Sequence, residues 1–112
     1  MAKVLGIQGE TLAKEHLEKL GYKIVATNYK NKIGEIDIIA YDNSTLVFVE
    51  VKCRQSIKFG YPREAVNFYK QNKIRSVAVG YLKYKGLYEK VNVRFDVIDI
   101  VGENITHIKN AF

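Results

Sequence analysis

The sequence predicts an α/β domain in which a mixed β-sheet is flanked by helices. Apolar residues recur at helical spacing in two segments, residues 8–20 and 62–84. β-Branched residues are concentrated in other segments, three between the helices and one after them. The predicted order is therefore α-β-β-β-α-β, with room for a fifth, short strand. A chain of 112 residues has the size of one domain, so we expect residues 1–112 to form a single unit.

The composition is that of an ordinary soluble globular protein, with 47% hydrophobic and 27% charged residues. The sequence has no long apolar run and no signal-peptide pattern at its start, so we expect no membrane span and a cytoplasmic location. Cys53 is the only cysteine, which excludes an internal disulfide. With His16 and His107 as the only histidines, a Cys/His zinc site is not expected.

The first helix is expected from about Gln8 to Leu20, after Gly6 and Gly9 and with Gly21 as its C-cap. Its apolar stripe consists of Ala13, Leu17 and Leu20. Glu10 falls on the same stripe, so the helix carries this carboxylate toward the sheet. Glu10 either complements the helix dipole or takes part in a metal site.

Two further segments form the strongest local prediction, a β-hairpin. Residues 33–41 and 46–53 are rich in β-branched residues, and turn formers occupy 42–45 between them. An earlier strand is expected from Tyr22 to Tyr29, with Ile24, Ala26 and Asn28 on one face.

The register of this hairpin brings charged residues together. A two-residue turn at Asn43–Ser44 and a four-residue loop over 42–45 give the same pairs. In both, Tyr41 faces Leu46, Ile39 faces Phe48, Asp37 faces Glu50 and Glu35 faces Lys52. Two opposed carboxylates at about 5 Å repel each other, so a positive charge is expected between them. A divalent cation with oxygen ligands fits there, and Lys52 can reach the same place.

A purely structural interpretation stays open for these charges. Glu35 and Lys52 can form a surface ion pair, which is common on the solvated face of an antiparallel sheet. However, the same face carries Ile39 and Phe48, so it is not a typical solvated face. The carboxylate of Asp37 opposite that of Glu50 favours a functional site.

The second helix is predicted from Pro62 to about Tyr84, with a break near Asn67. Its apolar stripe consists of Val66, Ile74, Val77 or Ala78, and Tyr81. Lys70 falls on the side of this stripe, so it either extends past the edge of the core or reaches the carboxylates. Gly80 is expected to permit close packing.

The positive charge of the chain is concentrated in one segment. From Lys52 to Arg75 there are seven basic residues and one acidic residue, a balance of +6 that equals the net charge of the whole chain. This segment starts at the carboxylates and favours a polyanionic partner, although a solvated basic face is the alternative. The loop from Arg54 to Tyr61 can contact phosphates, stack on a base, or pack Phe59 on the core.

The remaining segments are predicted as strands, residues 91–101 and a short edge strand over 105–108. Asp96 and Asp99 lie on the longer strand in different registers. Nothing in the sequence ties them to the other carboxylates, so we expect structural or peripheral roles for both.

The residues of the hairpin resemble a known pattern. Asp37, followed on the next strand by Glu50-Val51-Lys52, is similar to the PD-(D/E)xK nuclease signature, with Ile36 in place of its proline. Over nearly its whole length the chain more closely resembles the YraN-type family of small proteins, which are similar to archaeal-type Holliday-junction resolvases. The residues that carry this resemblance are Gly9-Glu10, Gly34-Glu35-Ile36-Asp37, Val49-Glu50-Val51-Lys52, Arg54, Phe59-Gly60, Pro62, Ala65-Val66, Lys70, Tyr81-Leu82 and Arg94-Phe95-Asp96-Val97.

The resemblance implies a restriction-endonuclease-like α-β-β-β-α-β core and metal-dependent hydrolysis of DNA phosphodiester bonds. Asp37, Glu50 and the Val51 carbonyl would hold Mg²⁺ or Mn²⁺, and Glu10 would complete the ligand shell or hold a second ion. Lys52 would orient the attacking water, and Glu35 would support the ligands from a second shell. The residues expected to bind the nucleic acid are Arg54, Lys58, Arg63, Lys70 and Lys73.

The expected substrate, by analogy with the resolvases, is branched DNA, and a homodimer would place two sites on two strands. Two other functions stay open. One is a DNA-binding protein that keeps the nuclease fold without catalysis. The other is a nuclease that acts on RNA or on single strands.

Overall fold

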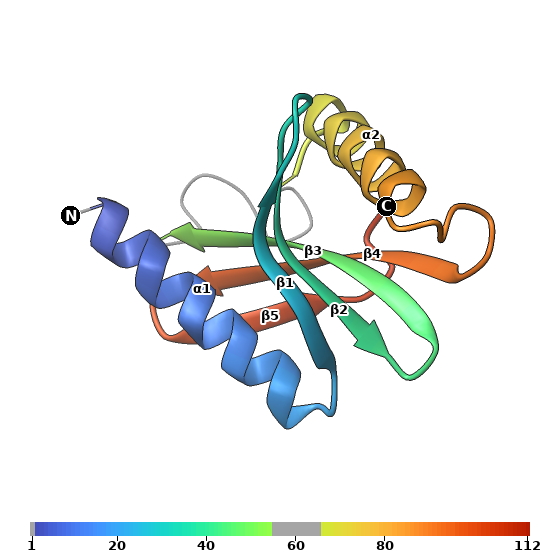
Figure 1. Ribbon diagram of the computed structural model, residues 1–112. Coiled ribbons are helices and arrows are strands. Elements are labelled where there is room, and N and C mark those ends of the chain that lie inside the picture. The colour runs from blue at the N-terminus through green and yellow to red at the C-terminus, as the bar shows by residue number, and fades with distance from the viewer. Residues whose placement is uncertain (1, 55–65) are drawn as a thin grey trace.

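The computed structural model describes residues 2–54 and 66–112, with side chains from Gln8 onward. A five-stranded sheet in the order β1-β2-β3-β4-β5 lies between two helices (Figure 1). The elements are α1 (Ala2–Lys19), β1 (Lys23–Lys30), β2 (Glu35–Asp42), β3 (Thr45–Arg54), α2 (Phe68–Tyr84), β4 (Asn92–Val101) and β5 (Asn104–Ile108). Of the four strand pairs in the described residues, β3–β4 is parallel and the others are antiparallel, and α2 lies in the crossover between β3 and β4. The predicted mixed α/β fold is therefore confirmed.

Each helix covers its own hydrophobic core. On one side, Ala13 and Leu17 of α1 pack against a cluster that includes Val47 and Ile98. On the other, α2 packs against a cluster that includes Phe48. The α2 residues in that cluster are Ile74, Val77, Ala78, Tyr81 and Leu82, which confirms the predicted stripe. In the described part of the chain, no helix combines the length and apolar character that a membrane crossing needs.

The hairpin of β2 and β3 has the predicted register near its turn. Asp42 pairs with Thr45, so the loop has two residues, and Asn43 adopts a φ of 55° there. The ladder ends at the pair Ile38–Val49. Beyond that pair β2 bends away from β3, as Figure 1 shows, and the expected pairs Asp37–Glu50 and Glu35–Lys52 fall outside the ladder.

The helix α1 differs from the prediction at both ends. It begins at Ala2, so Gly6 and Gly9 lie within the helix rather than before it. A Cβ atom at Gly9 would lie 1.8 Å from Sγ of Cys53, which shows how closely α1 approaches β3. At the other end, Leu20 follows the helix and is 51% exposed, so it does not join the buried stripe.

The first strand also departs from simple alternation. The pairing of β1 with β2 shifts between Ile24 and Ala26, because one extra residue is accommodated there. Ile24 therefore packs on the α1 side of the sheet, whereas Ala26 packs on the α2 side. The prediction of a common face for these residues is wrong for this reason.

The second helix begins where its break was expected. Asn67 caps α2, and its side-chain oxygen accepts a hydrogen bond from the Lys70 backbone N–H at 2.9 Å. The start predicted at Pro62 lies outside the described residues. Near the other end, a Cβ at Gly80 would lie 2.9 Å from Nδ2 of Asn31, so the absence of a side chain at Gly80 does permit close packing.

Candidate metal centre

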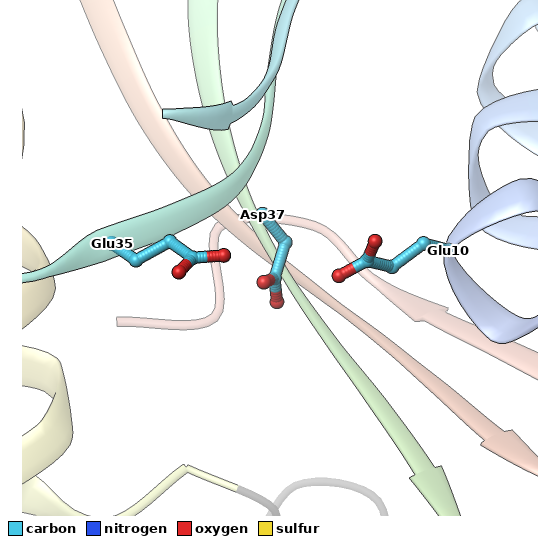
Figure 2. A group of neighbouring side chains, drawn as sticks. All are labelled: Glu10, Glu35 and Asp37. Carbon is cyan, nitrogen blue, oxygen red and sulfur yellow. The ribbon is translucent and has the colours of Figure 1, made fainter. Parts of the chain in front are cut away.

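Three carboxylates converge at the edge of the sheet where β2 leaves β3. Glu10 comes from α1, Glu35 begins β2, and Asp37 follows it on the same strand. One oxygen of each lies within 4.8 Å of the others, and Figure 2 shows the three side chains pointing toward a common centre. Carboxylate oxygens arranged in this way are the ligands that hard divalent cations prefer.

Asp37 is held in place by the backbone of β3. Its Oδ2 accepts a hydrogen bond from the Val51 N–H at 2.8 Å. This bond follows the last hairpin pair, so the side chain supplies an acceptor where β2 no longer runs beside β3. Burial, and then the negative charge of Glu50, raise the pKa of Asp37 to about 7 against the opposing effect of the Val51 N–H.

Glu50 lies beside Asp37 but outside the group of three. Its side chain is buried, and Oε1 forms an ion pair with Nζ of Lys70 at 3.1 Å. Burial raises the pKa of Glu50, while the positive charges of Lys70 and Lys52 and a hydrogen bond with Asp37 act in the opposite direction. Glu50 therefore connects the carboxylates to the positively charged start of α2.

Asn28 also belongs to this site, although no local sequence pattern indicated it. It adopts a left-handed φ of 52°, and the pairs on either side, Thr27–Ile38 and Tyr29–Ile36, place it across from Asp37. Its Nδ2 lies 3.1 and 3.2 Å from the two carboxylate oxygens of Glu10 and 3.3 Å from Oε1 of Glu35. The position of Asn28 depends on how β1 pairs with β2, and the sequence by itself does not specify this register.

The predicted ligand set is therefore brought together in part. Glu10 and Asp37 meet as expected, and Glu35, placed in a second shell by the sequence analysis, contributes a carboxylate to the same group. Glu35 pairs with Lys30 at 3.6 Å rather than with Lys52. Val51 takes part through its N–H, and the predicted role of its carbonyl stays a prediction.

The predicted basic residues fall into three groups. Lys52 is exposed and close enough to lower the pKa of Glu50, and Lys70 contacts Glu50 directly. Arg54 instead points inward, where its guanidinium binds the buried Asp99 carboxylate with an Nη2–Oδ2 distance of 2.7 Å. Lys73 is exposed, and Lys58 and Arg63 lie outside the described residues.

The donor set fits a divalent cation. In the described part of the chain, the donors and cations in contact with the three carboxylates include the amide of Asn28, the Lys30 ammonium and the Val51 N–H. One exposed ammonium and two neutral donors do not neutralise three carboxylates. The pKa of Asp37 is raised first by burial and then by the negative charge of Glu50, with smaller contributions from Glu10 and Glu35. This geometry defines the class of the protein. It is an α/β protein with a cluster of acidic residues between helix α1 and the point where strands β2 and β3 diverge.

The sequence comparisons place the chain in a family. Residues 9–100 match the uncharacterised protein family UPF0102, and the chain belongs to this family. This confirms the resemblance to the YraN-type proteins. Among its relatives, a UPF0102 protein of Alkaliphilus metalliredigens is 46% identical over the full length of both chains. A UPF0102 protein of Clostridium beijerinckii is 48% identical, over 98% of this chain and 94% of its own.

Proposed function

We propose that this protein is a metal-dependent DNA endonuclease that prefers branched DNA. The observation that carries the proposal is the convergence of Glu10, Glu35 and Asp37, with the Glu50–Lys70 ion pair beside them. Carboxylates beside lysines can serve a phosphodiester, because the carboxylates hold the cation while the ammonium groups meet the phosphate.

The chain's own residues have distinct tasks in this proposal. Glu10, Glu35 and Asp37 would hold Mg²⁺ or Mn²⁺, with Glu50 next to them. The cation would acidify a bound water and neutralise charge on the phosphate oxygens. Asp37 would bind the cation as a carboxylate, the form that prevails when the pH is above its pKa of about 7. Lys52, exposed at the edge of the site, would orient the attacking water and stabilise the charge that develops on the phosphate.

Substrate selection would depend on DNA shape. Lys70 and Lys73 on α2, with the basic residues that precede this helix in the sequence, would contact the phosphate backbone. Phosphate contacts carry no sequence information directly, so the choice of substrate would follow the path of the backbone rather than the bases. The preference for branched DNA rests on the resemblance to Holliday-junction resolvases, and a symmetric dimer would match the symmetry of a junction.

The test is cleavage of labelled DNA with Mg²⁺ or Mn²⁺. Four-way junctions, flaps, single strands and linear duplexes are compared for wild type, Asp37→Ala and Lys52→Ala. Glu18→Ala and Lys14→Ala, which change exposed charges elsewhere on α1, are the matched controls. We expect metal-dependent cutting that the two site variants lose by at least about a hundredfold and the controls retain.

Two results would contradict the proposal. Binding without cutting, unchanged in Asp37→Ala and Lys52→Ala, would indicate a DNA-binding protein without catalysis. Cutting of RNA or single strands in preference to junctions would keep the chemistry but replace the substrate. Circular dichroism of each variant separates loss of activity from loss of folding.

A further inference from the structure

Two aromatic side chains stand exposed at the start of α2. Phe68 and Tyr69 are the first two residues of the helix, and they are 72% and 73% exposed. The Asn67 cap, which accepts the Lys70 N–H, fixes this first turn, so both rings are presented from a rigid backbone. Adjacent aromatic residues this exposed on a small domain indicate a binding surface rather than part of the core.

The surroundings of this pair are positively charged. Lys70, the next residue, extends to Glu50 beside the candidate metal centre, with the 3.1 Å ion pair described above. Lys73 lies one turn further along, and its Nζ is 6.0 Å from the centroid of the Tyr69 ring. The first turn of α2 contains no acidic residue, and the N-terminal end of a helix adds partial positive charge. A polyanion that also offers flat apolar surfaces is the matching partner.

We propose that Phe68 and Tyr69 stack on unpaired nucleobases of the DNA strand that enters the metal centre, while Lys70 and Lys73 contact its phosphates. This inference rests on the proposed function. Bases within a continuous duplex are stacked on one another and offer no face to a protein ring, whereas unpaired bases do. Among branched DNAs, the preferred substrates are therefore those with unpaired nucleotides beside a duplex, such as flaps, and a gapped duplex offers the same unpaired bases.

The helix supplies a matched control at its other end. Tyr84 is 77% exposed and, like Tyr69, lies near a lysine, since Nζ of Lys85 is 5.5 Å from its ring centroid. It is the last residue of α2, about 24 Å along the helix axis from Phe68. Tyr84→Ala therefore removes an equally exposed aromatic ring at the end of α2 that is remote from Phe68 and Tyr69.

The experiment measures binding without chemistry. Fluorescence anisotropy in EDTA, at one fixed salt concentration, compares a fluorescein-labelled duplex containing a central gap of thymidines with a continuous duplex of the same length. We expect wild type to bind the gapped DNA more tightly. Phe68→Ala/Tyr69→Ala should reduce binding of the gapped DNA about tenfold or more and leave duplex binding unchanged. Tyr69→Phe and Tyr84→Ala should behave as wild type.

Several results would overturn the inference. These are equal binding of the two DNAs by wild type, an unchanged preference in the double variant, and equal weakening of both DNAs. Sedimentation that shows a wild-type dimer and a monomeric double variant would assign the rings to self-association instead. If the double variant does not fold by circular dichroism, Phe68→Ala and Tyr69→Ala are measured singly against the same criteria.

The outcome is separable from that of the proposed function. Metal-dependent cutting that Asp37→Ala abolishes, without any preference for gapped DNA, rejects the stacking inference alone. A preference for gapped DNA that depends on Phe68 and Tyr69, without cutting in Mg²⁺ or Mn²⁺, rejects the nuclease alone.

Discussion

Two pairs of carboxylates on the same sheet have opposite electrostatic surroundings. Asp96 and Asp99 on β4 are fully buried, and each binds an arginine. Asp37 and Glu50 on β2 and β3 are less deeply buried, yet their pKa values are raised. Burial by itself would raise the pKa of Asp96 as well, but hydrogen bonds from His107, Arg94 and the Asn110 N–H lower it below its ordinary value.

The difference lies in the partners that the fold supplies. Asp96 accepts from Nε of Arg94 at 2.9 Å and from the Asn110 N–H at 3.0 Å, and Nε2 of His107 lies 2.8 Å away. Asp37 receives the neutral Val51 N–H and lies near other carboxylates. The β4 carboxylates are neutralised within the fold, as their expected structural role requires. The carboxylates around Asp37 keep a charge that an external cation can neutralise.

The largest expected effect comes from removing the Arg94 guanidinium, which neutralises the buried Asp96 carboxylate. Arg94→Ala would leave the Asp96 carboxylate buried and short of a partner, and it would also remove contacts to Asp42 and Tyr22. We expect the free energy of unfolding to fall by about 3 to 5 kcal/mol. Urea denaturation measures it, with Lys14→Ala as an exposed control that changes stability by less than about 0.5 kcal/mol. A loss below about 1 kcal/mol would show that Arg94 does not stabilise Asp96.

The next effect concerns the close approach of α1 to β3, which positions Glu10 at the metal centre. Gly9→Ala would place a methyl group 1.8 Å from Sγ of Cys53, so either the Cys53 side chain must rotate away or α1 must move away from β3. We expect a loss of about 2 to 3 kcal/mol and weaker Mn²⁺ binding, since Glu10 follows Gly9 directly. Cys53→Ala removes the sulfur, and the double variant should regain most of the stability. An additive double variant would mean that the two residues do not clash.

Neutralising a carboxylate should have opposite effects in the two regions. At about pH 8 in EDTA, Asp37→Asn removes a charge that the folded state disfavours, and we expect a gain of about 2 kcal/mol. Asp96→Asn removes the partner of Arg94 and should destabilise the protein at the same pH. Thermal or urea unfolding measures both, and a loss of stability in Asp37→Asn would refute the comparison.

The pH dependence follows from the same shifts. Because the pKa of Asp37 rises from 3.8 to about 7 on folding, its contribution to stability decreases from about pH 4 to about pH 7 and then stays constant. Asp37→Asn should lack this decrease, so its advantage over wild type grows across that range. The pKa of Asp96 is lowered, so its contribution is present above its ordinary value of 3.8 and is lost as the pH falls through the lower folded-state pKa. Urea denaturation across the pH range measures both trends.

The smallest effect is expected at Asn28. Asn28→Asp would replace the amide that contacts Glu10 and Glu35 with a further carboxylate. We expect Mn²⁺ to bind about three- to tenfold more tightly by calorimetry, because cation affinity rises with the number of charged ligands. Asn28→Gly, which suits the φ of 52°, is the control for backbone conformation. Equal Mn²⁺ affinity in Asn28→Asp and wild type would place Asn28 outside the ligand group.

The sequence by itself determined the element order, the hairpin register near its turn and the core face of α2. These features depend on alternation, turn residues and helical spacing, which act over a few neighbouring residues. For the same reason Asp37, Glu50 and Glu10 could be selected as candidate ligands from their positions alone. Membership of the family was likewise evident from the motifs around these residues.

Only the tertiary structure decided which carboxylates meet. The bend of β2 away from β3 brings Glu35 into the group with Glu10 and Asp37, while Glu50 binds Lys70. Arg54, adjacent to the candidate site in sequence, turns inward to Asp99. These outcomes depend on contacts between segments far apart in the chain, such as α1 against β3 at Gly9, and no local pattern specifies them.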